Sequence, residues 1–205
     1  MAHLVLASAS PARLATLRGA GVEPLVVVSS VDEDAVVARY AVSDAADVAL
    51  VLARAKAEDV AARDDLPDGV VVLGCDSTLD LDGDVHGKPA SPEEAVARWR
   101  RMRGRTGVLH SGHWLVDLRD EGTGGTLGAV SSAVVHFADL TDDEIDAYVA
   151  TGEPLRVAGA FTVDGLGGPY VRGIEGDHHG VVGLSLPLLR DLLGELGVVW
   201  HTLRA

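Results

Sequence analysis

Apolar residues follow two patterns that alternate along this chain. Short continuous apolar runs, bounded by glycine or polar residues, predict strands at residues 4–6, 24–29, 70–74, 108–118, 127–137, 169–174 and 198–203. Apolar positions three and four residues apart, each series preceded by a capping residue, predict helices that start near Ser10, Asp44, Ser91, Thr141 and Ser185. The alternation predicts an α/β fold, and strands that follow one another near 79–86 and 108–137 predict a mixed sheet.

Length and composition suggest a simple organisation. The 205 residues contain no internal repeat or low-complexity linker, so we expect one domain over residues 1–205. No apolar run approaches the ~20 residues that span a bilayer, and the first residues lack the pattern of a signal peptide. The single cysteine, Cys75, excludes an internal disulfide and fits a reducing compartment. We therefore expect a cytoplasmic protein with no membrane partner.

The net charge of −14, from 31 acidic and 17 basic residues, narrows the possible partners. Nucleic-acid binders carry a basic face. The dense basic run here, at residues 98–105, lies at the end of an expected helix, where cations complement the helix dipole. We therefore expect no nucleic-acid partner. An anionic ligand would be repelled at long range unless a few cations or a bound metal reverse the field locally, so any phosphate site must be concentrated.

The stretch from Leu4 to Arg13 predicts a strand followed at once by a helix. Ser10 is the expected N-cap, and Pro11 occupies the first helical position, where its missing N–H costs nothing. Free backbone amides at a helix start attract anions, and Arg13 adds a positive charge in the first turn. The pattern is typical of a phosphate site and equally of an ordinary capped strand-to-helix turn.

Asp76 is the strongest catalytic candidate, because it follows the buried run 70–74 where that run ends abruptly. α/β proteins place reactive groups just past the ends of such strands. The adjoining Gly74 lets a ligand approach the backbone closely. The alternative is that Asp76 merely caps the next turn through Ser77 or Thr78.

Three further charged residues are candidates for binding phosphate or metal. Glu33, flanked by Asp32 and Asp34, is a candidate ligand for Mg²⁺, which favours carboxylates together with phosphate oxygens. A solvated acidic loop is the commoner meaning of such a run. Lys56 lies within a long amphipathic helix segment, where a surface role is the alternative, whereas Lys88 lies in a stiff Gly-Lys-Pro turn that fixes its charge in place.

The histidines and the cysteine are weaker candidates. His178 and His179 are adjacent and cannot form the i, i+4 pair of a helical zinc site. His110 and His113 fall on opposite faces of an expected strand. Cys75 has no local histidine or nucleophile elbow, so we expect a buried cysteine rather than a thiol nucleophile.

Seven short segments in order carry a resemblance that covers nearly the whole chain. They are Leu6–Arg13, Ser30–Glu33, Leu52–Ala57, Gly74–Ser77, Gly87–Pro89, Ala158–Phe161 and Val182–Pro187. Together they resemble the Maf family of nucleoside triphosphate pyrophosphatases. The resemblance implies cleavage between the α- and β-phosphates to a monophosphate and pyrophosphate, assisted by Mg²⁺ or Mn²⁺. It also implies an elongated mixed β-sheet flanked by helices (Maf/inosine-triphosphatase-like), two lobes with the nucleotide in a central cleft, and often a homodimer.

The resemblance also implies roles for individual residues. Asp76 falls at the family's general-base position, and Glu33, with Asp76, would hold the metal. The remaining phosphate-handling residues would be Ser8, Ser10, Arg13, Lys56 and Lys88.

Ala12, Ser77 and Asp164 stand where branches of the family differ in substrate. Members acting on dTTP and UTP usually have Arg, Thr and Gln there, and the branch acting on 7-methyl-GTP tends to carry Trp, Gln and Glu. This chain follows neither set. The acidic Asp164 slightly favours the 7-methyl-GTP branch, because a carboxylate can accept hydrogen bonds from a guanine edge.

We therefore expect a metal-assisted enzyme that removes non-standard or excess nucleoside triphosphates, either 7-methyl-GTP-like or pyrimidine. The alternative is a nucleotide-binding regulatory protein with little or no hydrolytic activity. The presence together of Asp76, Glu33, Lys56 and Lys88 favours the enzyme, because binding alone would not need the whole set.

Overall fold

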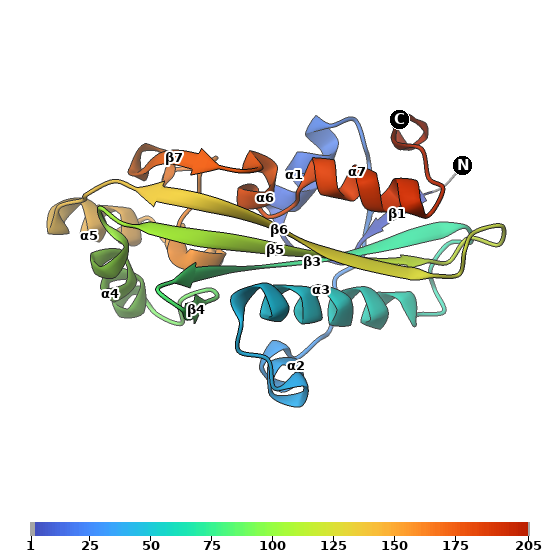
Figure 1. Ribbon diagram of the computed structural model, residues 1–205, viewed down its shortest axis with the longest axis horizontal. Coiled ribbons are helices and arrows are strands. Elements are labelled where there is room, and N and C mark those ends of the chain that lie inside the picture. Colours follow the sequence, from blue (N-terminus) through green and yellow to red (C-terminus); the bar gives the residue numbers. More distant parts are fainter. Residues whose placement is uncertain (1–2, 205) are drawn as a thin grey trace.

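One mixed sheet of seven strands runs along the computed structural model, which describes residues 3–204 (Figure 1). The strands are β1 (His3–Leu6), β2 (Leu25–Val26), β3 (Val70–Leu81), β4 (Asp84–His86), β5 (Thr106–Asp117), β6 (Thr126–Phe137) and β7 (Val171–Glu175). Their order is β2-β1-β3-β5-β6-β7, and β4 pairs with β3. β1 is parallel to β2 and β3, and the other pairs are antiparallel. The predicted mixed α/β sheet is confirmed.

Helices flank this sheet. The α-helices are α1 (Pro11–Gly19), α2 (Glu33–Tyr40), α3 (Ala45–Ala61), α4 (Pro92–Met102), α5 (Asp142–Ala150), α6 (His178–Val182) and α7 (Leu186–Glu195), and the 3₁₀-helices are η1 (Pro154–Arg156), η2 (Ala158–Ala160), η3 (Gly168–Tyr170) and η4 (Trp200–Leu203). α1, α6 and α7 lie over one face of the sheet, whereas α3 lies against the other with α2 beyond it (Figure 1). Within residues 3–204, no helix combines the length and apolar content that crossing a membrane requires.

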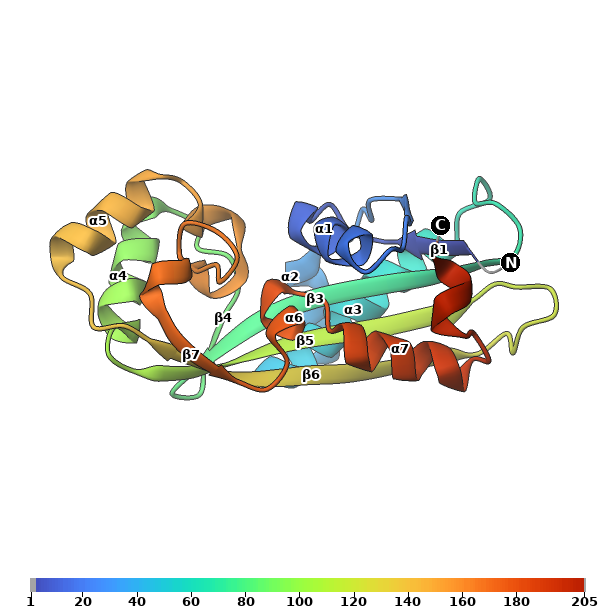
Figure 2. The same ribbon diagram turned by 90° about the horizontal axis from the view of Figure 1, so that it is seen from above.

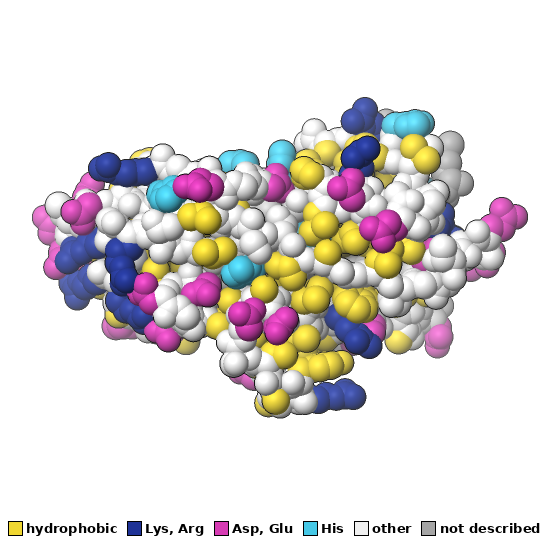
Figure 3. Space-filling model, viewed as in Figure 1, with side chains coloured by type: hydrophobic (Ala, Val, Ile, Leu, Met, Phe, Trp, Pro, Cys, Tyr) yellow, Lys and Arg dark blue, Asp and Glu magenta, His cyan; other side chains and the backbone are white. Residues whose placement is uncertain are grey.

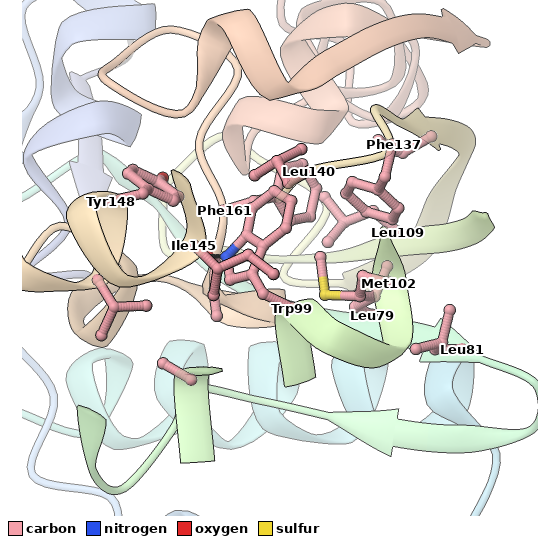
Figure 4. Packing of buried hydrophobic residues seen from close by; sticks show 14 of the residues in the cluster. Leu79, Leu81, Trp99, Met102, Leu109, Phe137, Leu140, Ile145, Tyr148 and Phe161 are labelled. Atoms are coloured by element: carbon pink, nitrogen blue, oxygen red, sulfur yellow. Dashed lines mark hydrogen bonds between the residues drawn. The ribbon is translucent and has the colours of Figure 1, made fainter. Parts of the chain in front are cut away.

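The helices gather in two lobes (Figure 2). We call the group of α1, α2, α3, α6 and α7 around β1 and β2 the first lobe, and the group of α4, α5 and η1–η3 with β4 and β7 the second lobe. The second lobe has an aromatic core around Trp99 (Figure 4). The Trp99 ring meets Phe137 and Tyr148 edge-on, with centroid distances of 5.8 and 5.6 Å. Such edge-to-face contacts fix the mutual orientation of the segments that carry them.

Strand β3 joins the two lobes, because its side chains change neighbours along its length. Near its start, Leu73 packs into the core shared with α1 and α7, and Val72 packs on the opposite face with α3. Further along, Leu79 and Leu81 enter the core of the second lobe. The same continuous strand therefore sets the spacing between the lobes.

Contact between α3 and the sheet depends on two glycines. A Cβ at Gly74 of β3 would overlap the carbonyl oxygen of Ala53 and lie 2.8 Å from the nitrogen of Ala57. A Cβ at Gly112 of β5 would overlap the carbonyl oxygen of Ala49. Because both positions lack a side chain, the backbone of α3 lies directly on the two central strands.

Two expectations about strands are wrong. β3 does not end before Asp76 but continues to Leu81, because β5 pairs with it along this whole stretch. Residues 198–203 form no strand and end in η4. Trp200 and Leu203, three residues apart, both pack against the first-lobe core, which suits the period of a 3₁₀-helix.

The acidic run at residues 31–34 begins a helix rather than forming only a loop. The Asp32 side chain accepts a hydrogen bond from the backbone nitrogen of Ala35 and caps α2. Glu33 and Asp34 lie in the first turn, where the helix dipole favours negative charge. The helix start fixes the backbone position from which Glu33 extends.

We predict that Gly74→Ala lowers the free energy of unfolding by at least about 2 kcal/mol, because overlap with a helix backbone cannot be relieved by rotating a side chain. Urea unfolding measures the change. Gly194→Ala, at an exposed helical glycine with no heavy atom within 4 Å of its added Cβ, should leave stability unchanged or raise it. Equal stability of the two variants would contradict the proposed contact.

Candidate active site

A cavity of about 610 Å³ opens between the two lobes. Its first-lobe walls come from the β1–α1 connection, α2, α3 and α6, and its second-lobe walls from the β4–α4 connection and the segment 156–164. Residues 76–78 in the middle of β3 lie between these walls. The elements that line the cavity face one another across the space between the lobes in Figure 2.

All of the residues that the sequence singles out as site candidates line this cavity. They are Ser8, Ser10, Ala12, Arg13, Glu33, Lys56, Asp76, Ser77, Lys88 and Asp164. The fold therefore brings together positions that are up to 156 residues apart in sequence (8 to 164). Their individual roles stay predictions.

The ammonium group of Lys56, on α3, lies between the carboxylates of Glu33 and Asp76. Its Nζ contacts Asp76 Oδ1 and lies 2.7 Å from Glu33 Oε1. Lys56 and Asp76 are each 12% exposed, whereas Glu33 is 50% exposed. Since α3 rests on the backbone of β3, a lysine from the helix reaches a carboxylate of the strand directly.

The two carboxylates differ in proton affinity. Burial raises the pKa of Asp76, and the positive charges of Lys56 and Arg13 offset this only in part. Burial also acts to raise the pKa of Glu33, but the charges of Lys56, Lys88 and Arg13 outweigh it and lower that pKa. Asp76 is therefore the better proton acceptor, and Glu33 stays ionised.

Arg13 is an internal anchor more than an exposed cation. Its Nε donates to the carbonyl of Gly183 at 2.8 Å, and its two terminal nitrogens donate to Ser8 Oγ, the Cys75 carbonyl and Ser77 Oγ at 3.1, 2.8 and 3.1 Å. Four of the five N–H groups of the guanidinium are thus used within the protein. One remains for a ligand.

A chain of hydroxyl groups continues from Arg13 to α6. Ser111 Oγ donates its single proton to the carbonyl of Gly180 at 2.8 Å. Ser77 Oγ lies 2.7 Å from Ser111 Oγ, so Ser77 must be the donor of that bond. The Ser77 proton is therefore directed at Ser111 rather than into the cavity, and the Ser77 oxygen also accepts from Arg13. Ser77 therefore contributes to the cavity wall as an acceptor and a positioning group.

His113 anchors the segment that follows α6. Its Nδ1–H donates to the carbonyl of Ser111 at 3.0 Å, and its Nε2 accepts from the backbone nitrogen of Ser185, the N-cap of α7, at 2.9 Å. Burial lowers the pKa of His113 to about 4, which keeps the ring neutral and able to accept this bond. Together with Arg13, this histidine fixes the loop around Gly183.

The second lobe supplies the exposed cations of the cavity. Lys88 and Arg156 both line it and are exposed. Within residues 3–204, neither side chain forms an ion pair or hydrogen bond with another residue. The ammonium group of Lys88 and the guanidinium group of Arg156 are thus available to a ligand. Asp164, also exposed, adds a carboxylate to the same wall.

The arginines of the basic run 98–105 lie elsewhere. Basic side chains gather at the end of the molecule that carries α4 (Figure 3). Arg101, Arg103 and Arg105 form ion pairs of 2.7, 2.7 and 2.6 Å with nearby aspartates. Much of their charge is therefore balanced locally, as in an ordinary solvated helix end.

The carboxylates of Glu33 and Asp76 suit a divalent cation that takes its remaining ligands from a bound substrate. Their carboxylates converge on one point, now held by Lys56 Nζ. Within residues 3–204, no group of three or more His, Cys, Asp or Glu residues could hold a metal by itself. Two carboxylates suit Mg²⁺, which takes its other ligands from phosphate and water.

Cys75 is not suited to nucleophilic chemistry. Its side chain is fully buried, and this burial raises the pKa of the thiol to about 12. A thiol that stays protonated is a poor nucleophile. The expected buried cysteine is confirmed.

Arg156, Ser111 and His113 were not predicted as parts of this site. The partners of Ser111 are 34 and 69 residues away, so no local pattern could have indicated its role. His110 and His113 lie on opposite faces of β5, as expected. The role of His113 depends on its hydrogen bond with Ser185, which is 72 residues further along the chain. Arg156 is indicated only by its place on the cavity wall.

The family model described as Maf-like protein matches residues 3–196. A nucleoside triphosphate pyrophosphatase of Streptomyces coelicolor is 57% identical over 195 residues, covering 95% of this chain and 91% of that protein. Proteins of the same name from Salinispora tropica and Leifsonia xyli are 59% and 56% identical, covering 96% and 98% of this chain and 84% and 96% of their own lengths. A solved dITP/XTP pyrophosphatase of Mycobacterium abscessus covers 96% of this chain and 95% of its own at 15% identity, with a TM-score of 0.39.

We predict a specific loss of stability at low pH from His113. Its pKa is about 4 when folded and about 6.5 in an unfolded chain, so the unfolded state binds the proton first as pH falls. Stability therefore declines below about pH 6.5, by about 2 kcal/mol at pH 5 from this group. His113→Gln, whose amide can still accept from Ser185, should lack this part of the decline in urea unfolding at pH 7.5 and pH 5.

His201→Gln, which removes an exposed imidazole, serves as the control and should keep the decline of the unaltered protein. The same pH dependence in all three proteins would contradict the assignment.

Proposed function

Because this chain belongs to the Maf-like protein family, we propose that it hydrolyses nucleoside triphosphates to nucleoside monophosphate and pyrophosphate. The observation that carries this proposal is the placement of Lys56 between Glu33 and Asp76 at a cavity that also exposes Lys88 and Arg156. Relatives of 56–59% identity named nucleoside triphosphate pyrophosphatases support it.

Both lobes bind the triphosphate. Lys88 and Arg156 approach it from the second lobe, and Arg can hold two phosphate oxygens at once. From the first lobe, the start of α1 adds its dipole, capped by Ser10. Ser8 Oγ accepts from Arg13 and from the nitrogen of Ser10, so its own proton is free to donate to a phosphate oxygen. The last N–H of Arg13 supports the same oxygens.

Asp76 activates the attacking water. The water oxygen forms a bond to the α-phosphorus while the bond from that phosphorus to the α–β bridging oxygen breaks. The proton of the water passes to Asp76, and pyrophosphate leaves with the bridging oxygen. The raised pKa of Asp76 favours this transfer, and the ammonium of Lys56 orients the carboxylate.

Glu33 and Asp76 would hold Mg²⁺ or Mn²⁺ together with the substrate, and the bound cation would neutralise phosphate charge and stabilise the leaving group. The charges that line the cavity support the requirement for a metal cation. Four cations, Arg13, Lys56, Lys88 and Arg156, are matched by four carboxylates, Glu33, Asp34, Asp76 and Asp164. A formally neutral cavity on a chain of net charge −14 does not balance a triphosphate without a further cation.

Ala12, Ser77 and Asp164 set the preference for the nucleobase. Ala12 adds only a methyl group to the cavity wall, and the internal hydrogen bonds of Ser77 leave that side chain only an acceptor role. Asp164 is the exposed carboxylate of the opposite wall and accepts hydrogen bonds from base N–H groups. This combination supports 7-methyl-GTP-like substrates over pyrimidine nucleotides.

We also propose that the protein removes non-standard or excess nucleotides in the cytoplasm (a house-cleaning role) and that it forms a homodimer. The edge strand β2 exposes Leu25 and Val26 by 46% and 40%, which supports a contact between two copies. Light scattering after size exclusion should then give twice the chain mass of 21.3 kDa. A particle of one chain mass across the micromolar range would contradict the dimer.

A panel of canonical and modified nucleoside triphosphates with Mg²⁺ or Mn²⁺ tests the reaction. We expect pyrophosphate as the first product and no turnover after metal chelation. Orthophosphate as the first product would overturn the proposal. Tight binding without turnover on any member of the panel would favour a regulatory protein instead.

In the same assay, Asp76→Asn should lower kcat by about 10²–10⁴-fold, as expected for loss of a positioned base. Cys75→Ala, at the adjacent buried position, is the matched control and should keep nearly full activity. An unchanged kcat in Asp76→Asn would contradict the role given to Asp76, and loss of activity in a folded Cys75→Ala would favour the thiol as the reacting group instead.

A further inference from the structure

The carbonyl oxygen of Gly87 connects three segments of the second lobe. It accepts a hydrogen bond of 2.6 Å from a terminal nitrogen of Arg98 on α4. It also accepts one of 3.1 Å from the backbone nitrogen of Gly159 in η2. Gly87 immediately precedes Lys88, so this single oxygen anchors the turn that carries the lysine.

The neighbour of Arg98 makes a parallel contact. Trp99 Nε1 donates to the carbonyl of Ala160 at 2.8 Å. Successive residues of α4 thus hold both second-lobe segments of the cavity wall, the turn with Lys88 and the segment that begins after Arg156. α4 itself does not line the cavity, so its effect on a ligand must pass through these two segments.

Stability alone does not account for an arginine at position 98. The residue is 5% exposed, and its Nε is buried with no hydrogen-bond partner among residues 3–204. Its other partner, Glu94, lies 2.6 Å away but is 46% exposed and would be solvated without it. Burying such a charge carries a desolvation cost that an apolar side chain of similar length avoids.

We propose that Arg98 is a positioning residue that acts through Lys88. By holding the Gly87 carbonyl, it fixes the turn so that the lysine ammonium is directed into the cavity before the triphosphate binds. This inference rests on the phosphate-binding role of Lys88 proposed above.

The expected effect lies in binding rather than in the chemical step. Without Arg98, the Gly87 carbonyl keeps, within the described part of the chain, only its bond from Gly159. The turn must then be ordered when the substrate binds. The reacting groups on α3 and β3 are untouched. Arg98→Met should therefore raise KM about tenfold and leave kcat within about twofold.

A double-mutant cycle tests this route. KM, kcat and the melting temperature are measured for Arg98→Met, Lys88→Met and the double variant. If Arg98 acts through Lys88, adding Arg98→Met to Lys88→Met causes no further rise in KM. The melting temperature of Arg98→Met should not fall, because methionine avoids the buried charge. Arg101→Met, on the same helix but 46% exposed, is the matched control and should change neither KM nor kcat.

The outcomes separate the inference from the proposed function. Independent, multiplicative rises in KM for the two substitutions would overturn the inference alone, as would an unchanged KM in Arg98→Met. An unchanged KM in Lys88→Met would overturn the phosphate-binding role and the inference with it, and so would absence of pyrophosphate release by the unaltered protein. Should Arg98→Met fail to fold, Arg98→Lys, which keeps the charge but loses the two-pronged donor, enters the same cycle and is judged by the same outcomes.

Discussion

Backbone contact between α3 and the central strands is the constraint on which the rest of the molecule depends. Gly74 and Gly112 allow it, and any side chain there would push the helix away from the sheet. The consequence is chemical as well as structural, because Lys56 then meets Asp76 inside the strand and Glu33 at the start of α2. A packing requirement of the core thus fixes the spacing of these three charged groups.

A second constraint is the use of cations as internal anchors. The sequence predicts Arg13 as a phosphate ligand. In the structure, four of its five N–H groups donate hydrogen bonds to β3, the Gly183 loop and Ser8. Ser77 and Ser111 extend this anchor to α6, and His113 holds the segment beyond it. These groups shape the cavity by being satisfied within the protein, which limits what they can offer a ligand.

The mixed sheet and five of the capped helices were predicted from local patterns, whereas the short helices α2 and α6 were not. Asp76, Glu33, Lys56, Lys88 and Arg13 were candidates from their local setting, and the rest of the site set came from the family resemblance. Strand ends were less predictable: Asp76 interrupts an apolar run, but pairing with β5 carries the strand past it. The residues near Trp200 look like a strand, but their packing on the first-lobe core selects a 3₁₀-helix. What could not be predicted were contacts across many residues, above all the proton direction in the Ser77–Ser111 pair and the buried bond from Arg98 to Gly87.

Charge explains why the two lobes differ in what they contribute. In the first lobe, Lys56 and Arg13 are engaged by carboxylates, carbonyls and hydroxyls, whereas Lys88 and Arg156 in the second lobe face solvent. A polyanion approaching a chain of net charge −14 is therefore attracted mainly by the second lobe, whereas Glu33 and Lys56 belong to the first lobe and Asp76 to the strand that joins the two. Because the lobes have separate cores, correct alignment requires a fixed spacing between them. The continuous strands β3, β5 and β6 provide it, so the precision of the site depends on how firmly each lobe holds its charged side chains to this common sheet.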